Sequence, residues 1–222
     1  ITGWQSGDSS LQALTDSGIF VKYLGGAEDD DLIGGPYNET FEGGAGSDNI
    51  DGGDGDDTYI MTNIAERDNL VELEDGGSDT LDYSGIATGQ IVTLTKSNGV
   101  PGIFGIDARE VENVTGTQGD DTIYGSDSDN VISGFEGEKD ILDGGIGSDT
   151  YVFTVNFATE TLIVEDHNDT GANTIDISMV TGTGADEDYR AKVTVGTADT
   201  AGGVTIEKLT PSGTATGAVI ST

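Results

Sequence analysis

Aspartate recurs at the sixth position of nine-residue units that begin with glycine. The clearest units read GGAGSDNID (43–51), GGDGDDTYI (52–60) and GGIGSDTYV (144–152). Glycine allows a tight turn because it adopts positive φ without a Cβ clash. Such a turn directs backbone carbonyls and the position-6 carboxylate towards a common point. Oxygen-only ligands suit a hard cation that accepts about six to eight of them, so this pattern predicts Ca²⁺ sites.

The units form two phased blocks, which begin at Gly25 and Gly116. The units span 25–33, 34–42, 43–51, 52–60, 116–124, 125–133, 134–143 and 144–152. A short sequence repeated at a fixed period is typical of a solenoid, in which each unit packs on its neighbours.

The last three positions of each unit predict a short strand, because Thr, Ile, Tyr and Val favour β structure. Side chains alternate along a strand, so position 8 should point inwards and position 7 outwards. The predicted inward column is Leu32, Phe41, Ile50, Tyr59, Ile123, Ile132, Leu142 and Tyr151. We interpret these side chains as core.

The charge balance separates two readings of the acidic composition. The chain has 42 Asp and Glu against 8 Lys and Arg, a formal net charge of −34. High charge with low hydrophobicity is typical of disorder, but the regular apolar positions favour a fold whose carboxylates are neutralised by cations. The charge argues against binding of nucleic acid or of anionic lipid, because both need a basic surface. Calcium binding is then expected to contribute directly to folding.

Catalytic motifs are missing from the sequence. There is no cysteine, and His167, the single histidine, lies in an acidic turn. Neither H-E-x-x-H nor G-x-S-x-G occurs, so we do not expect an enzyme. No apolar run approaches the length of a membrane span, and the first residues do not resemble a signal peptide.

The repeat G-G-x-G-x-D-x-U-x, where U is a large apolar residue, resembles that of the RTX (repeats-in-toxin) family of Gram-negative bacteria. Three units match at every fixed position. The resemblance implies an all-β fold, a right-handed parallel β-roll or β-helix with flanking β-strand segments. Two units would make one turn, and each Ca²⁺ would lie between units n and n+2. Type I secretion and folding in millimolar extracellular calcium are also implied.

The resemblance also implies a set of metal ligands. The position-6 partners would be Asp30 with Asp48, Glu39 with Asp57, Asp121 with Asp140, and Asn130 with Asp149. The ion-facing glycines would be Gly43, Gly44, Gly46, Gly52, Gly53, Gly55, Gly144, Gly145 and Gly147. Acidic turns follow both blocks, and their carboxylates are further candidates that would close the last site of each roll: Glu74, Asp75 and Asp79 after the first block, and Glu165, Asp166 and Asp169 after the second. The alternative for each aspartate is a solvated turn carboxylate.

Several units depart from the pattern. Tyr37 stands where glycine is expected, and a tyrosine at positive φ would distort the turn. Asn130 removes one ligand charge, and Lys139 would repel a cation. We therefore expect the best sites to be anchored by Asp48, Asp57 and Asp149.

The blocks and the segments that follow them predict two tandem modules. The first spans 25–115 and the second 116–222, each with a β-rich tail. Residues 1–24 would be the end of a preceding β module.

Together these features predict a calcium-binding, calcium-folded structural or adhesive segment of a large secreted or cell-surface bacterial protein, such as an adhesin or surface-layer protein. The alternative is a polysaccharide-binding module accessory to an extracellular enzyme. The expected partners are calcium ions, with neighbouring modules or cell-surface glycans as further candidates. An autonomous enzyme would require a concave pocket with perturbed carboxylates.

Overall fold

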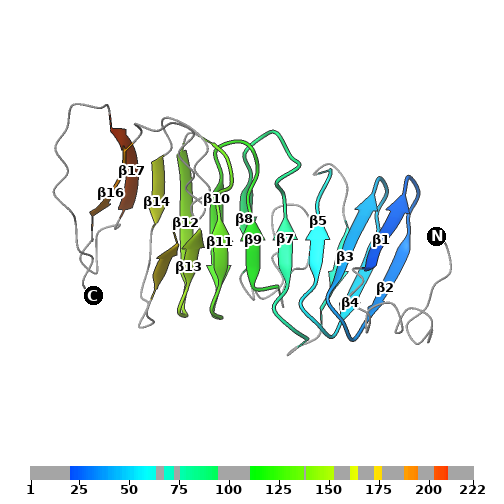
Figure 1. Ribbon diagram of the computed structural model, residues 1–222. Helices are drawn as coiled ribbons and strands as arrows, with labels where there is room; N and C mark the ends of the chain where they lie inside the picture. The colour runs from blue at the N-terminus through cyan, green and yellow to red at the C-terminus, as the bar shows by residue number, and fades with distance from the viewer. Residues whose placement is uncertain are drawn as a thin grey trace. The chain divides into compact units, whose positions relative to one another are not determined.

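The computed structural model describes residues 21–63, 68–72, 76–94, 111–137, 139–152, 161–164, 173–176, 188–194 and 203–209. All elements in these ranges are β-strands (Figure 1). Most pair in parallel and stack as a β-solenoid, which confirms the predicted all-β roll. In the described ranges, no helix has the length and apolarity needed to cross a membrane.

The chain divides into two compact units, each described by itself. The first comprises Ile1–Ile86 and Val92–Thr115, and the second Ala87–Ile91 and Gly116–Thr222. Strand β8 (Ile91–Thr93) starts in the second unit and ends in the first. The predicted modules of 25–115 and 116–222 stay a prediction, and residues 1–20 lie outside the described part.

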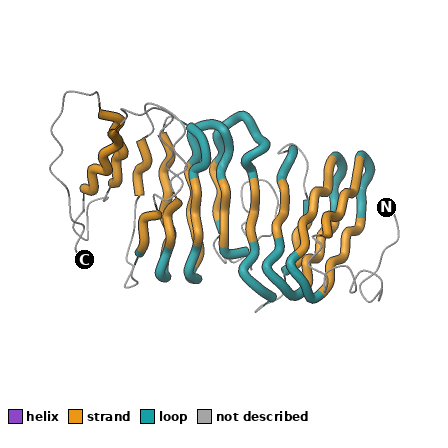
Figure 2. The backbone as a smooth tube through the Cα atoms, viewed as in Figure 1, coloured by secondary structure: helices purple, strands orange, loops and turns teal. Residues whose placement is uncertain are grey.

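The first unit is built from two parallel sheets. Its strands are β1 (Val21–Gly26), β2 (Asp31–Gly35), β3 (Glu39–Gly44), β4 (Asn49–Gly53), β5 (Thr58–Ile60), β6 (Asn69–Val71), β7 (Thr80–Asp82) and β9 (Asn113–Thr115). One sheet has the order β1-β3-β5-β7-β9 and the other β2-β4-β6. From β1 to β7 successive strands alternate between the sheets, and short turns join β1 to β5 (Figure 2). Two repeat units therefore make one turn of the roll.

The second unit repeats this arrangement. Its strands are β10 (Thr122–Ser126), β11 (Val131–Ser133), β12 (Lys139–Gly145), β13 (Thr150–Val152), β14 (Thr161–Val164) and β15 (Thr174–Asp176). Strands β10, β12 and β14 are neighbours in one sheet, and β11, β13 and β15 in another. Thr122 pairs with Ile141 and Val131 with Thr150, so the register absorbs the extra residue of unit 134–143. An antiparallel pair, β16 (Asp188–Thr194) and β17 (Gly203–Leu209), lies later in the chain.

Position 8 supplies the core, as the alternation predicts. All eight residues of the predicted inward column are buried, from Leu32 at 7% exposed to Ile123 and Leu142 at 0%. In the first unit the column begins one repeat earlier than the sequence suggested. Tyr23 of β1 stacks on Phe41 with ring centroids 4.8 Å apart, and Phe41 stacks on Tyr59 at 5.5 Å. Residues 21–24 thus extend the roll through pairing of β1 with β3.

Backbone strain falls at a different place from the one predicted. Phe135 is the only described non-glycine residue with positive φ, at +69°. Tyr37 avoids that region, so the strain of a tyrosine at positive φ is absent there. Its turn adopts another conformation, described below.

Candidate metal centre

In the first compact unit, position-6 side chains accept hydrogen bonds from the backbone of the neighbouring rung, which is the nonapeptide two repeats earlier in the sequence. Oδ1 of Asp48 accepts a hydrogen bond from the amide of Asp30 at 2.9 Å. Oδ1 of Asp57 accepts one from the amide of Glu39 at 2.7 Å. The structure therefore brings together both pairs that the sequence placed in units n and n+2 of this block.

The second unit contains the same contact. Oδ1 of Asp140 accepts the amide N–H of Asp121 at 2.8 Å, and Oδ1 of Asp149 accepts that of Asn130 at 2.9 Å. These hydrogen bonds repeat along each unit as a ladder, which we call the position-6 ladder. The role of its members as ion ligands stays a prediction.

The ladder lies inside the wall of the roll. Asp48 and Asp57 are each 1% exposed, Asp140 and Asp149 are 0% exposed, and only Asp30 of the predicted set is half-buried. Burial of a charged carboxylate is costly unless it is paired. Oδ2 of Asp57 is buried and has no hydrogen-bond partner. A bound cation or a proton would satisfy it.

Glycine at position 1 makes room for the carboxylate of its own unit. A Cβ on Gly43 would lie 3.0 Å from Cγ of Asp48 and closer still to Oδ2. Gly52 and Gly144 face the position-6 carboxylates of their own units in the same way. The remaining predicted glycines, at positions 2 and 4, have positive φ and pack on backbone of the preceding rung: Gly44, Gly46, Gly53, Gly55, Gly145 and Gly147.

The conformation of position 2 decides what the second oxygen of position 6 contacts. In unit 34–42 the amide of Gly35 donates to Oε2 of Glu39 at 3.1 Å. In unit 116–124 the amide of Thr117 donates to Oδ2 of Asp121 at 2.7 Å. Neither position-2 residue has positive φ. In these units the turn itself satisfies the carboxylate.

Unit 125–133 follows the same rule. The amide of Ser126 donates to Oδ1 of Asn130 at 2.7 Å. The units that match the repeat at every fixed position differ, because Gly44, Gly53 and Gly145 have φ of +98°, +94° and +88°. Gly26, at position 2 of unit 25–33, also has positive φ, at +143°, so this conformation is not confined to the exact units. That the best cation sites are those of Asp48, Asp57 and Asp149 stays a prediction.

Phe135 shares the positive φ of these glycines although it carries a side chain. It stands at position 2 of the ten-residue unit, whose position-6 residue Asp140 is fully buried. The carboxylate of Asp140 thus lies in the same kind of turn as those of the exact units. Lys139, which was expected to repel a cation, is exposed and donates its amide to Asp120 Oδ1 at 3.0 Å.

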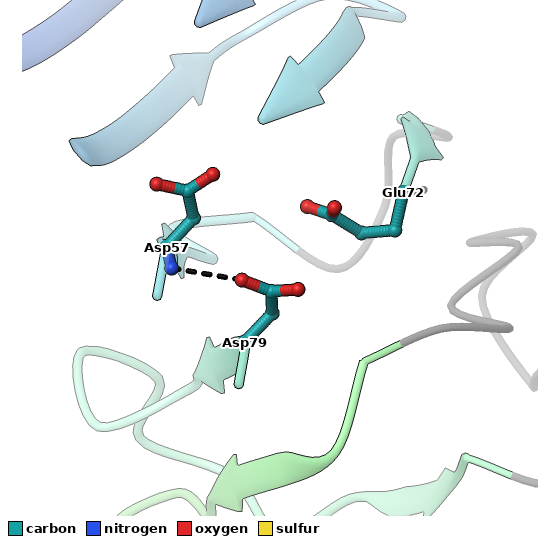
Figure 3. Close-up of side chains that lie close together, drawn as sticks. All are labelled: Asp57, Glu72 and Asp79. Carbon is teal, nitrogen blue, oxygen red and sulfur yellow. Dashed lines mark hydrogen bonds between the residues drawn. The ribbon is translucent and has the colours of Figure 1, made fainter. Parts of the chain in front are cut away.

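Asp79 and one unpredicted carboxylate join Asp57 at the end of the first block. Ligand oxygens of Asp57, Glu72 and Asp79 all lie within 4.8 Å of one another (Figure 3). The amide of Asp57 donates to Oδ1 of Asp79 at 2.8 Å. The other acidic turn residues considered from the sequence, Glu74, Asp75, Glu165, Asp166 and Asp169, lie outside the described residues.

Sequence reasoning missed further members of the ladder. Oδ1 of Asp68 accepts the amide of Asp48 at 3.1 Å, and Oε2 of Glu112 accepts that of Asp79 at 2.9 Å. Inserted residues hide them by breaking the nine-residue period. The last four positions of the repeat are still recognisable, because both residues begin an acid-x-apolar-x sequence, D-N-L-V and E-N-V-T.

Position 5, which the repeat leaves variable, forms a second ladder in the opposite direction. Oδ1 of Asp29 accepts the amide of Ser47 at 2.9 Å. Oδ1 of Asn38 accepts the amide of Asp56, also at 2.9 Å. Adjacent rungs are thus tied by side chains at two successive positions of each turn.

Burial perturbs the carboxyl groups of this region. Burial raises the pKa of Asp57 to about 7, and the negative charges of Glu39, Asp79 and Asp56 add to this rise. The hydrogen bond from the Glu39 amide acts in the opposite direction and lowers the pKa. Burial likewise raises the pKa of Asp79 to about 6, with Glu112 as the leading charged neighbour. The pKa values of Glu39 and Asp121 are raised mainly by burial. A cation among these groups would favour their charged forms instead.

Both blocks match a known family. A family model of the RTX calcium-binding nonapeptide repeat, in four copies, matches residues 24–59 and 115–151. No curated protein matches the chain. The matched stretches contain the position-1 glycines and most of the position-6 ladder, and the chemistry of these oxygen donors fits Ca²⁺.

We predict that Gly43→Ala lowers the free energy of unfolding in saturating calcium by about 1–3 kcal/mol, because the added methyl group displaces the Asp48 carboxylate. The matched control is Gly85→Ala, since a Cβ on Gly85 would meet nothing within 4 Å. Chemical denaturation followed by circular dichroism measures both variants. Equal stability of Gly43→Ala and wild type would contradict the proposed role of position 1.

We also predict opposite pH dependences with and without calcium. The pKa values of Asp57 and Asp79, about 7 and about 6, lie above the ordinary 3.8. Their contribution to the ion-free fold is therefore full at low pH and lost as the pH rises through 6 to 7. In chelator, β content by far-UV circular dichroism should increase as the pH falls from about 8 to about 5.

Calcium affinity should instead increase with pH over this range, because the ligands must lose their protons. Calorimetric titration at each pH measures it. A β content in chelator that rises with pH would show that these carboxyls are not the controlling groups.

Proposed function

The chain carries RTX calcium-binding nonapeptide repeats folded as a β-roll, and from this premise we propose that it is a calcium-folded structural segment of an adhesin or surface-layer type protein. The observation that carries the proposal is the buried position-6 ladder. Its carboxylates join one rung to the next, so the ions that neutralise them hold the backbone of the roll together.

The repeats suggest a secreted protein. We propose export through a type I system as an unfolded chain, with folding outside the cell. Cytosolic calcium is too scarce to neutralise the ladder, whereas extracellular modules typically bind calcium at about 10⁻⁴–10⁻³ M. Secretion and folding would thus be separated by the calcium gradient.

We propose a structural rather than a catalytic use of the perturbed carboxyls. Raised pKa values in a cluster are one mark of an active site. Here, however, Asp57 and Asp79 each accept a backbone amide within a pattern that repeats along the unit. The repeat explains their positions without a substrate.

The polysaccharide-binding alternative has less support from the described surface. A glycan platform would present a row of exposed aromatic side chains. Within residues 21–63, 68–72, 76–94, 111–137 and 139–152, Tyr124, at 39%, is the one exposed aromatic side chain. An array of glycans probed with and without calcium tests this alternative, and saturable binding to one glycan would favour it.

A structural segment should bear force only when calcium is bound. We predict that single-molecule stretching in about 5 mM calcium gives discrete unfolding events, which chelator abolishes because charged, unneutralised rungs separate. Asp48→Asn should lower the unfolding force. Asp54→Asn, at an exposed site, is the control and should not. Identical force traces in calcium and chelator would contradict the proposal.

A further inference from the structure

A carboxylate replaces glycine in the position-1 column of the first unit. Gly34 and Gly52 occupy this position in β2 and β4, two residues after the inward apolar residue of each strand. Strand β4 pairs with β6 so that Asp51 faces Val71. Continuing this register by one residue places Glu72, which follows β6, at the level of Gly52. In all four nonapeptides of the first block this position is glycine.

The side chain of Glu72 turns into the wall of the unit. Both of its carboxylate oxygens are buried. Figure 3 shows it directed towards Asp57 and Asp79, which precede β5 and β7 of the other sheet. Asp57 and Asp79 are each 1% exposed, so three carboxylates from two sheets share one secluded space.

A buried hydroxyl points into the same space. Tyr59 is 0% exposed, and its hydroxyl oxygen has no hydrogen-bond partner. The three atoms nearest to a Cβ built on Gly52 are this oxygen, Oδ2 of Asp57 and Oε1 of Glu72. Oxygens from three side chains thus converge beside one glycine. Oδ2 of Asp57 also has no hydrogen-bond partner.

The corresponding tyrosine of the second unit shows that this arrangement is not a general feature of the repeat. The hydroxyl of Tyr151 accepts the amide N–H of Gly144 at 2.8 Å. The residue that receives the amide of Asp149 there is Asn173, at 2.6 Å, where the first unit has Asp79. At this step of the ladder the first unit therefore has a carboxylate where the second has an amide, and its tyrosine hydroxyl is left without a hydrogen-bond partner.

We propose that Glu72 completes, with Asp57 and Asp79, a Ca²⁺ site at the end of the first block, with the Tyr59 hydroxyl beside the ion. The inference rests on the proposed function for the identity of the ion. Glu72 belongs to no nonapeptide, so the repeats alone do not assign it as a ligand. An ion here links the two sheets of the first unit and closes its block.

The ligand chemistry predicts that this site is the tightest of the unit. Three carboxylates give it more charge than a position-6 pair, and calcium affinity increases with ligand charge. A trivalent lanthanide, which has the same preference for oxygen ligands, should bind here first. The nearby phenol makes terbium a suitable probe, because tyrosine transfers excitation to a terbium ion in close contact.

The test compares Glu72→Gln with Glu28→Gln, whose side chain is exposed in the first repeat, using the whole chain. Calcium is counted by equilibrium dialysis, and terbium is titrated with excitation of tyrosine. We expect Glu72→Gln to bind one ion fewer and to weaken the tightest step at least tenfold, with Glu28→Gln unchanged. If Glu72→Gln binds the same number of ions with the same affinity as the wild type, the inference is overturned. Calcium binding by the wild type would still uphold the proposed function. A wild type that binds no calcium would overturn both.

Tyr59→Phe provides a second test that does not depend on the folding of Glu72→Gln. It keeps the ring stacked on Phe41 and removes only the hydroxyl. The part of the terbium emission that belongs to the tightest step should fall at least fivefold. Full emission from Tyr59→Phe would place the ion elsewhere and overturn the inference.

Discussion

The hydrogen bond from a backbone amide of one rung to a position-6 carboxylate of the next links the turns of each unit. A hydrogen bond to a charged group contributes about 1.5–3 kcal/mol. Removing the charge from water costs several kcal/mol even after relaxation. The hydrogen bond alone therefore does not offset burial of Asp57, whose second oxygen has no hydrogen-bond partner, and a cation or a proton must neutralise it. Neutralisation of such a carboxylate, by calcium or by a proton, is therefore expected to be coupled to folding.

Glycine and the backbone decide where that requirement is greatest. At Gly35, Thr117 and Ser126 the turn donates its own amide to the position-6 side chain. At Gly53 a positive φ accompanies an Asp57 oxygen that lacks a hydrogen-bond partner. These three turns thus supply a hydrogen bond to position 6 themselves, whereas the turn of Asp57 leaves one oxygen for an ion or a proton. The rungs of the roll therefore differ in how far their own backbone satisfies the position-6 side chain.

Much of this architecture could be predicted from residue types at fixed spacing. Phe41 and Tyr59 are core because position 8 of every unit points inwards, and Asp48 contacts the rung of Asp30 because two units make a turn. Tyr23 was missed because its unit lacks the glycines. Glu72 was missed because a carboxylate at position 1 contradicts the repeat, and only the three-dimensional pairing of β4 with β6 places it beside Gly52 and Asp57. The position-2 conformations depend on how each turn packs on its neighbour, which no single unit encodes.

The most direct test of the central claim is a calcium titration that starts in chelator at neutral pH and is followed by far-UV circular dichroism. The account predicts a cooperative change from coil to β structure with a midpoint between about 0.1 and 1 mM calcium. A β spectrum that persists unchanged in excess chelator, with no ion bound, would contradict it. The buried carboxylates would then be held by protons and amides alone, and the nonapeptides would be glycine-rich turns without a calcium-dependent role.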